Sequence, residues 1–225
     1  MNKFIAIVLL ALTALCFSPI TSLFADEEEP AQEPVEPDET VALFNGEDLT
    51  GWTGNDNIWR IRNGIIHCTG SERGILRTDE HYTNYILTLE WRYPEDDASE
   101  GTRDSGVFLH AQNNTQFDPW PTCIEAQLQS GAAGDFWLMG IGVTPMSTGD
   151  QVTSGRIPRN DDVEEQPMGE WNTITITCDD GFIEIEINGE VANTGNHLTL
   201  TSGAIALQYE GQVVEFRNIE IGPLE

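Results

Sequence analysis

The chain has 225 residues, of which 38 are Asp or Glu and only 10 are Lys or Arg, so the formal net charge at pH 7 is -28. Such an acidic surface repels a phosphate backbone and an anionic membrane, which argues against nucleic acid and membrane surfaces as partners. Hydrophobic residues make up 39% of the chain, enough for one sizeable core, and Gly and Pro follow no period. Collagen-like, coiled-coil and wholly disordered classes are therefore excluded.

Residues 1–25 are typical of an export signal. Met1-Asn2-Lys3 supplies a short cationic start, Phe4 to Phe17 is an apolar run, and Ala25 offers the small residue that signal peptidase needs. A retained transmembrane anchor is the alternative, but the run is short for a membrane span. We expect the signal to be cleaved, which predicts a secreted or periplasmic mature protein with no membrane span.

The segment 26–40 reads DEEEPAQEPVEPDET, with eight acids, three prolines and no aromatic residue. Such a composition buries too little apolar area to offset chain entropy, so it predicts a solvated, extended and disordered linker before a domain at 41–225. The domain contains Cys68, Cys123 and Cys178. An exported protein can join two of them in a disulfide, but each falls in an apolar strand, which favours buried free thiols.

From Val41 onward, hydrophobic residues recur at every second position, which is typical of half-buried strands. The clearest are strand 85–93 and the hairpin formed by 171–178 and 182–188. In strand 213–221 the alternation slips at Arg217-Asn218, which indicates a β-bulge. No window of useful length shows helical periodicity. About a dozen short strands of this kind predict an all-β, jelly-roll β-sandwich.

Three further segments, 104–110, 122–129 and 204–210, each place polar side chains on one face. If they share one concave sheet with strand 85–93, these faces line a single groove. The groove then contains Glu90, Arg92, Asp104, His110, Glu125, Gln127 and Gln208, with Trp120 and Trp137 on flanking segments to stack on a sugar ring. The alternative is that these are ordinary solvated outer faces, and alternation alone does not distinguish the two.

A series of short motifs runs through the domain. The motifs are LFNGEDLTGW at 43–52, WRIRNG at 59–64, SGVFL at 105–109, EAQ at 125–127, GEWN at 169–172, ING at 187–189, GAIALQ at 203–208 and EFRNI at 215–219. In this order and spacing the set resembles the 3-keto-disaccharide hydrolase domain family over nearly all of 41–225. Two places depart from the family pattern: Arg103-Asp104 stands where Gly-Asn is usual, and residues 134–140 replace an aromatic motif.

The resemblance implies a concanavalin A-like jelly roll, usually exported, that cleaves glycosides whose glucosyl unit carries a 3-keto group. A ketone at C3 acidifies the C2 hydrogen, so a base can remove it, the C1 oxygen leaves by β-elimination, and water adds afterwards. Glu125 is our first choice of base or acid, because it projects from a rigid strand. His110 is the second, since its ordinary pKa near 6.5 serves either role. Arg103 or Arg92 steadies the enolate charge, and Asp104 orients a base or holds a cation.

Other readings remain open at this point. An ordinary two-carboxylate glycosidase is less favoured, because Gln127 and Gln129 follow Glu125 where a second acid is needed. A non-catalytic carbohydrate-binding or adhesion module would use the same groove. No cofactor is predicted, although acidic loops at 95–97 and 161–162 suit a divalent cation. The segment 140–169 predicts either a lid or a surface excursion. The sequence indicates neither the leaving group nor the oligomeric state.

Overall fold

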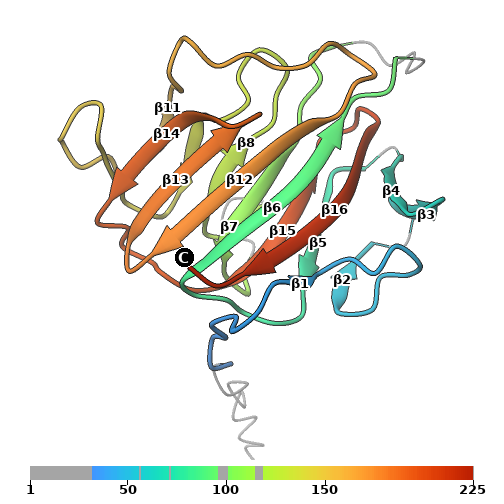
Figure 1. Ribbon diagram of the computed structural model, residues 1–225, viewed down its shortest axis with the longest axis horizontal. Helices are drawn as coiled ribbons and strands as arrows, with labels where there is room; N and C mark the ends of the chain where they lie inside the picture. Colours follow the sequence, from blue (N-terminus) through green and yellow to red (C-terminus); the bar gives the residue numbers. More distant parts are fainter. Residues whose placement is uncertain (1–31, 56, 71, 96–100, 115–118, 225) are drawn as a thin grey trace, which may run out of the picture. The chain divides into compact units, whose positions relative to one another are not determined.

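The computed structural model describes residues 32–55, 57–70, 72–95, 101–114 and 119–224. Within these ranges the chain forms two β-sheets with antiparallel strand pairs, and no helix is present (Figure 1). The predicted all-β jelly-roll sandwich is confirmed. No helix in the described part of the chain is long and apolar enough to cross a membrane.

The nine-stranded sheet has the order β10-β14-β13-β12-β6-β16-β4-β3, and β1 pairs with one end of β16. Its strands are β1 (Val41–Ala42), β3 (Trp59–Arg62), β4 (Ile65–Cys68), β6 (Tyr85–Arg92), β10 (Thr144–Pro145), β12 (Asn172–Asp179), β13 (Phe182–Ile187), β14 (Glu190–Asn196) and β16 (Val214–Gly222). The seven-stranded sheet has the order β11-β9-β8-β7-β15-β5-β2. Its strands are β2 (Trp52–Gly54), β5 (Gly74–Thr78), β7 (Gly106–Ala111), β8 (Cys123–Gln127), β9 (Phe136–Met139), β11 (Gly155–Ile157) and β15 (Ala204–Tyr209).

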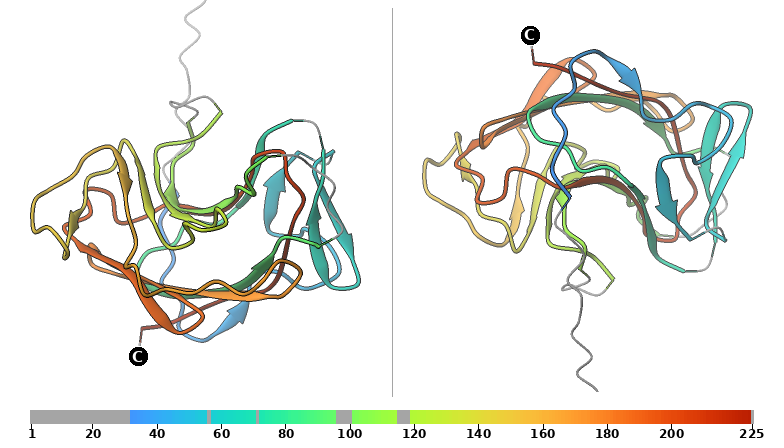
Figure 2. Two further views of the ribbon diagram at one scale, coloured as in Figure 1. Left: turned by 90° about the horizontal axis from the view of Figure 1, so that it is seen from above. Right: turned by 90° about the horizontal axis from the view of Figure 1, so that it is seen from below.

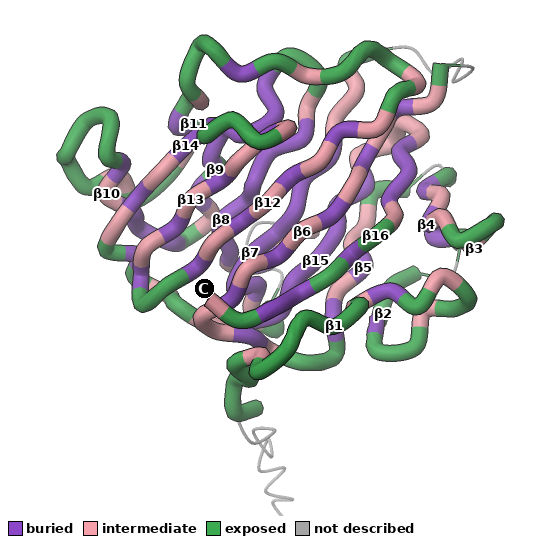
Figure 3. The backbone as a smooth tube through the Cα atoms, viewed as in Figure 1, coloured by how far each residue is buried: buried purple, intermediate pink, exposed green. Residues whose placement is uncertain are grey.

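The core lies between the two sheets. In β6 the side chains of Tyr85, Leu87, Leu89 and Trp91 are buried and the intervening ones are half-buried, as expected for a strand with one wet face. In contrast, β7, β8 and β15 are buried along their whole length (Figure 3). Both faces of these three central strands are therefore covered, one by the core and the other by groups on the outer side of the sheet.

Both sheets curve in the same sense, and the seven-stranded sheet lies on the concave side (Figure 2). The outer face of its central strands carries a second, smaller apolar cluster made of Phe108, Ala111, Cys123, Ala204 and Ala206. The candidate site lies on this concave outer face, next to the outer cluster.

The structure confirms the bulge predicted in strand 213–221, but it places strand 85–93 in a different sheet from the one expected. The bulge at Arg217-Asn218 is confirmed, because the pairing of β16 with β6 shifts register between Arg217 and Glu220 and Asn218 has a φ of 51°. The expectation that strand 85–93 joins the other polar strands is wrong. Its counterpart β6 pairs with β12 and β16 in the nine-stranded sheet, since alternation reports a strand's faces and not its neighbours.

Only part of the predicted N-terminal region, from residue 32 onward, lies within the described residues. The predicted export signal, residues 1–25, lies outside the described residues and stays a prediction. Residues 32–40 are largely exposed, as expected for a solvated segment, but they also bond to the domain. The Val35 amide donates a hydrogen bond of 2.8 Å to the His81 carbonyl, and Val35 forms a bridge with Tyr82. Among the described residues Cys68, Cys123 and Cys178 are free and buried, as favoured from the sequence.

Candidate active site on the seven-stranded sheet

A pocket of about 410 Å³ opens on the outer, concave face of the seven-stranded sheet. It is lined by Asp104, Trp120, Glu125, Gln127, Gln129, Trp137, Leu138, Met139, Gly155, Gln208 and Glu210. Of the residues proposed from the sequence, the pocket therefore brings together Asp104, Glu125, Gln127, Trp120, Trp137 and Gln208. This volume is within the range of small-molecule sites.

Strand pairing sets the polar half of the pocket. Glu125 in β8 lies opposite Phe108 in β7, and two residues further along Gln127 lies opposite Gly106. Asp104 comes two residues before Gly106, so it continues the same face. The Glu125 side chain extends over Gly106, since a Cβ at that position would overlap its carboxyl, and Asp104 lies near enough for its charge to act on this carboxyl. Asp104 and Glu210 together are called the acid end below.

The same pairing sets the other half. Glu125 lies opposite Trp137 in β9, and Cys123 lies opposite Met139. Trp120 packs edge to face on Phe108, with ring centroids 5.5 Å apart and an interplanar angle of 77°. Trp120, Trp137 and Met139 are called the aromatic end. Glu125 therefore lies at the junction between a polar and an apolar half of one pocket.

The Glu125 carboxyl is buried without the partners that a carboxylate needs. The residue is 5% exposed, and its Oε1 atom has no hydrogen-bond partner. A Cβ at position 106 would overlap this carboxyl, so only glycine in the neighbouring strand leaves room for it. Burial first, and then the negative charges of Asp104 and Glu210, hold the pKa of Glu125 well above its ordinary value. A carboxyl in this environment favours its protonated form.

The two carboxyls of the acid end share one cation. Burial raises the pKa of Asp104, while a hydrogen bond from the Ser105 amide and the charge of Arg73 lower it. Burial likewise raises the pKa of Glu210, which Arg73 opposes through an ion pair of 2.8 Å. Because Asp104 is less buried than Glu125 and has a nearby cation, it ionises first. The pocket thus holds a proton donor and an ionisable base.

Gln127 has a fixed orientation. Its side-chain oxygen accepts hydrogen bonds of 2.8 Å from the backbone amides of both Leu128 and Gln129. The amide nitrogen, with its two hydrogens, is therefore the part that Gln127 presents to the pocket. Gln208 is also buried, and its Oε1 atom has no partner. Unpaired polar atoms of this kind at a pocket surface are available to a ligand.

His110 does not join Glu125, contrary to the sequence expectation. Its φ is 54°, and the pairing of β7 with β15 shifts register between Ala204 and Ala206, so the alternation of β7 is interrupted there. The ring instead contacts the core residue Tyr85, with centroids 6.1 Å apart, and its Nδ1 lies 2.9 Å from the Leu200 carbonyl. Burial lowers the pKa of His110 to about 4. The histidine is a neutral interior residue.

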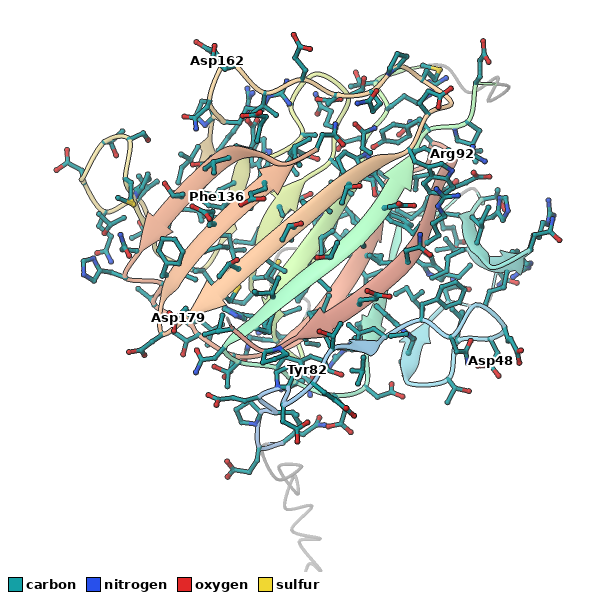
Figure 4. The ribbon with its side chains drawn as sticks, viewed as in Figure 1. Asp48, Tyr82, Arg92, Phe136, Asp162 and Asp179 are labelled. Atoms are coloured by element: carbon teal, nitrogen blue, oxygen red, sulfur yellow. The ribbon has the colours of Figure 1, made fainter. Side chains whose placement is uncertain are left out.

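Three other residues proposed for the site also lie away from the pocket. Arg92 and Glu90 are on β6 in the nine-stranded sheet, where Figure 4 labels Arg92 near the end of the strand. Arg92 pairs with Glu215 at 2.6 Å and stacks on Trp171 at 4.5 Å. Arg103 precedes β7 and does not line the pocket.

Several pocket residues were missed from the sequence. The alternation that singled out Gln208 also places Glu210 on the same face, but Glu210 was left out of the predicted groove. Met139 ends the short strand β9 and Gly155 begins the short strand β11, and neither strand is long enough for alternation to point to them. The acidic loops were considered for a divalent cation, and no group of three His, Cys, Asp or Glu side chains in the described ranges is arranged to hold a metal ion. Of the two acidic loops, residues 96 and 97 lie outside the described residues.

The fold is shared with solved proteins that act on or bind carbohydrates. A protein from Parabacteroides distasonis that carries the name glycosyl hydrolase is 22% identical, with a TM-score of 0.60 over 83% of this chain and 94% of that one. The carbohydrate-binding module CBM66 from Bacillus subtilis is 7% identical, with a TM-score of 0.55 over 76% of this chain and 94% of that one. At these identities the likeness establishes a sandwich of this class and no more.

Residues 39–222 match the family described as the 3-keto-alpha-glucoside-1,2-lyase-like domain, and the chain belongs to this family. A curated relative, the 3-keto-disaccharide hydrolase of Bacteroides thetaiotaomicron, is 32% identical over 110 residues. The match covers 43% of this chain and 36% of the relative, so it spans little more than a third of that protein's length. The family resemblance found in the sequence motifs is confirmed.

Proposed function

We propose that this domain cleaves glycosides whose glucosyl unit carries a 3-keto group, by removing the C2 proton and eliminating the C1 oxygen. The observation that carries the proposal is the Glu125 carboxyl, which is buried in the pocket with an unpaired oxygen and a raised pKa. A site that needs an acid and a base at neutral pH is built from two carboxyls whose environments separate their pKa values. Membership of the family supports the same chemistry.

In the proposed reaction Asp104 is the base and Glu125 is the acid. The Asp104 carboxylate takes the C2 proton, and the electron pair of that C–H bond moves to make an enolate at C3. The enolate then re-forms the ketone, a C1–C2 double bond forms, and the C1–O bond breaks. Glu125 gives its proton to the departing oxygen. In hydration the steps run in reverse with water: Glu125 takes a proton from water, hydroxide adds at C1, and Asp104 returns its proton to C2.

Gln127 takes the role that Arg92 and Arg103 were expected to have. The enolate places negative charge on the C3 oxygen, and a fixed hydrogen-bond donor at that oxygen stabilises it without reorganising. The anchored amide of Gln127 is such a donor in the polar half of the pocket. Gln208 and Glu210 remain to bind sugar hydroxyls.

The test is turnover of a 3-keto-glucoside that carries deuterium at C2. The wild-type protein is expected to release the alcohol with a primary isotope effect and to lose the label to solvent. Glu125→Gln and Asp104→Asn are each expected to lower kcat by about 1000-fold, within the range for general acid–base groups. Glu186→Gln, on the outer face of β13, is the matched control and keeps wild-type turnover.

A non-catalytic carbohydrate-binding module is the second candidate, and the 38% exposure of Trp137 at the pocket favours it, because exposed aromatic rings suit sugar stacking. Such a module binds the 3-keto-glucoside without releasing the alcohol. It also keeps its affinity in Glu125→Gln. This pair of results would replace the catalytic proposal by the binding one.

A further inference from the structure

The two halves of the pocket differ in the partners they offer to a substrate. On one side of Glu125 lie the acid end and the amides of Gln127 and Gln208, which can bond several hydroxyls. On the other side lies the aromatic end, with Trp120, Trp137 and Met139. Since Glu125 is the proposed acid at the scissile oxygen, the sugar and the leaving group fall on opposite sides of it.

The keto sugar belongs to the polar half, because its hydroxyls need partners when they lose water. The leaving group then meets two indole side chains and a thioether. A second sugar in that position can stack its C–H face on an indole ring, but the hydroxyls around its edge would be buried beside side chains that offer few acceptors. An aromatic ring would bury only apolar area there, and it stacks on indole rings at little cost.

The side chains of the aromatic end are held in place by packing and strand pairing. Phe108 holds the Trp120 ring edge to face, and Met139 packs on the same outer apolar cluster. Trp137 faces the solvent side and is held by strand pairing directly beside Glu125. The net charge of -28 further disfavours anionic leaving groups.

We infer that the substrate is a 3-keto-glucoside whose leaving group is an uncharged aromatic alcohol, bound against Trp120, Trp137 and Met139. This inference rests on the proposed function, whose site it shares. It concerns the group that leaves and not the bond that breaks.

The experiment compares three 3-keto-glucosides whose leaving oxygens are all bonded to a saturated carbon, so that intrinsic reactivity is similar. They are the methyl glucoside, the benzyl glucoside, whose alcohol carries an aromatic ring, and a 3-keto-disaccharide. The benzyl compound is expected to have a kcat/KM about tenfold above both others, mainly through a lower KM. A disaccharide that equals or exceeds the benzyl compound overturns the inference.

Substitutions in the aromatic end test whether these residues cause the preference for the benzyl compound. Trp137→Ala and Met139→Gln are expected to reduce the benzyl-to-methyl ratio of kcat/KM to near one, and Trp137→Phe to keep most of it. Met146→Ala, which removes another exposed apolar side chain, serves as the control with an unchanged ratio. An unchanged ratio in both Trp137→Ala and Met139→Gln would assign the preference elsewhere and overturn the inference.

Failure of the proposed function gives a different result. If the wild-type protein turns over none of the three compounds, catalysis is wrong, and calorimetry with methyl and benzyl glucosides tests the aromatic end alone. Tighter binding of the benzyl compound by about tenfold, lost in Trp137→Ala, upholds the binding preference. Equal affinities for both glucosides overturn it.

Discussion

The outer faces of the two sheets each carry a buried glutamate, and the surroundings of the two differ. On the nine-stranded sheet one oxygen of Glu215 lies 2.7 Å from the His67 Nδ1, and the other forms an ion pair of 2.6 Å with Arg92. Beside it, Glu90 pairs with Arg217, and the two arginines stack on Trp171. On the seven-stranded sheet no cation from the described part of the chain pairs with Glu125, and one of its oxygens has no partner.

The difference separates a structural cluster from a chemical one. A carboxylate whose two oxygens are both engaged by side chains of neighbouring strands holds those strands together and has little capacity left for a substrate. A carboxyl that is buried beside other acids costs stability, and such a cost persists where the group reacts. Charge pairing is therefore a better guide to the active site here than the mere presence of acids and arginines on a strand.

The same substitution on the two faces is expected to act in opposite directions. Glu215→Gln leaves the buried end of Arg92 without its anion, so the free energy of unfolding should fall by roughly 3 kcal/mol. Glu125→Gln removes a carboxyl whose charged form the pocket disfavours, so stability at pH 7 should rise by about 1 kcal/mol. Urea unfolding of both variants measures this. Equal losses in the two would end the distinction between the faces.

A third buried titratable group extends the comparison to the interior. Because His110 has a pKa of about 4 in the folded protein and near 6.5 when unfolded, the unfolded state binds more protons between these values. Stability therefore falls as pH is lowered from 6.5 to 4, by about 3 kcal/mol from this group, and no further below that. The measurement is the difference in unfolding free energy against pH between wild type and His110→Asn, since Asn tolerates a positive φ. A difference that is flat with pH contradicts the interior assignment.

A substitution at Gly106 tests whether the Glu125 carboxyl acts from its observed position. A methyl group at this position overlaps the Glu125 carboxyl, so Gly106→Ala should displace it and lower kcat by about 100-fold, an effect typical of a misplaced catalytic group. The control is Gly70→Ala, where the added methyl group meets nothing closer than 3.7 Å and φ is ordinary. Wild-type activity in Gly106→Ala would mean that the carboxyl does not act from the observed position.

Alternation along the strands predicted much of this site, because a period of two assigns each side chain to one face of the sheet. Asp104, Glu125, Gln127 and Gln208 share the pocket as that period predicted. His110 was misplaced because one extra residue in β7 reverses every later side chain, and the apolar neighbours on both sides hide the insertion.

Strand 85–93 shows the second limit. Its faces were correctly predicted, but Glu90 and Arg92 were placed in the groove although their strand pairs with β12 and β16. Pairing partners are set by contacts between residues far apart in the chain, such as Arg92 with Glu215, and no local pattern encodes them. The electrostatic contrast between the two faces follows from this pairing, so it also required the structure.

The smallest expected effect concerns Arg73, the cation that lowers the pKa values of Asp104 and Glu210. In Arg73→Gln both pKa values rise, so Asp104 is ionised only at higher pH and the acid limb of kcat/KM moves to higher pH. At pH 7 activity should fall a few-fold, because the Arg73 side chain is 62% exposed and its charge is partly screened. The exposed Arg62→Gln is the control, with an unchanged profile. An acid limb that stays in place or moves to lower pH would show that the acid end does not supply the base.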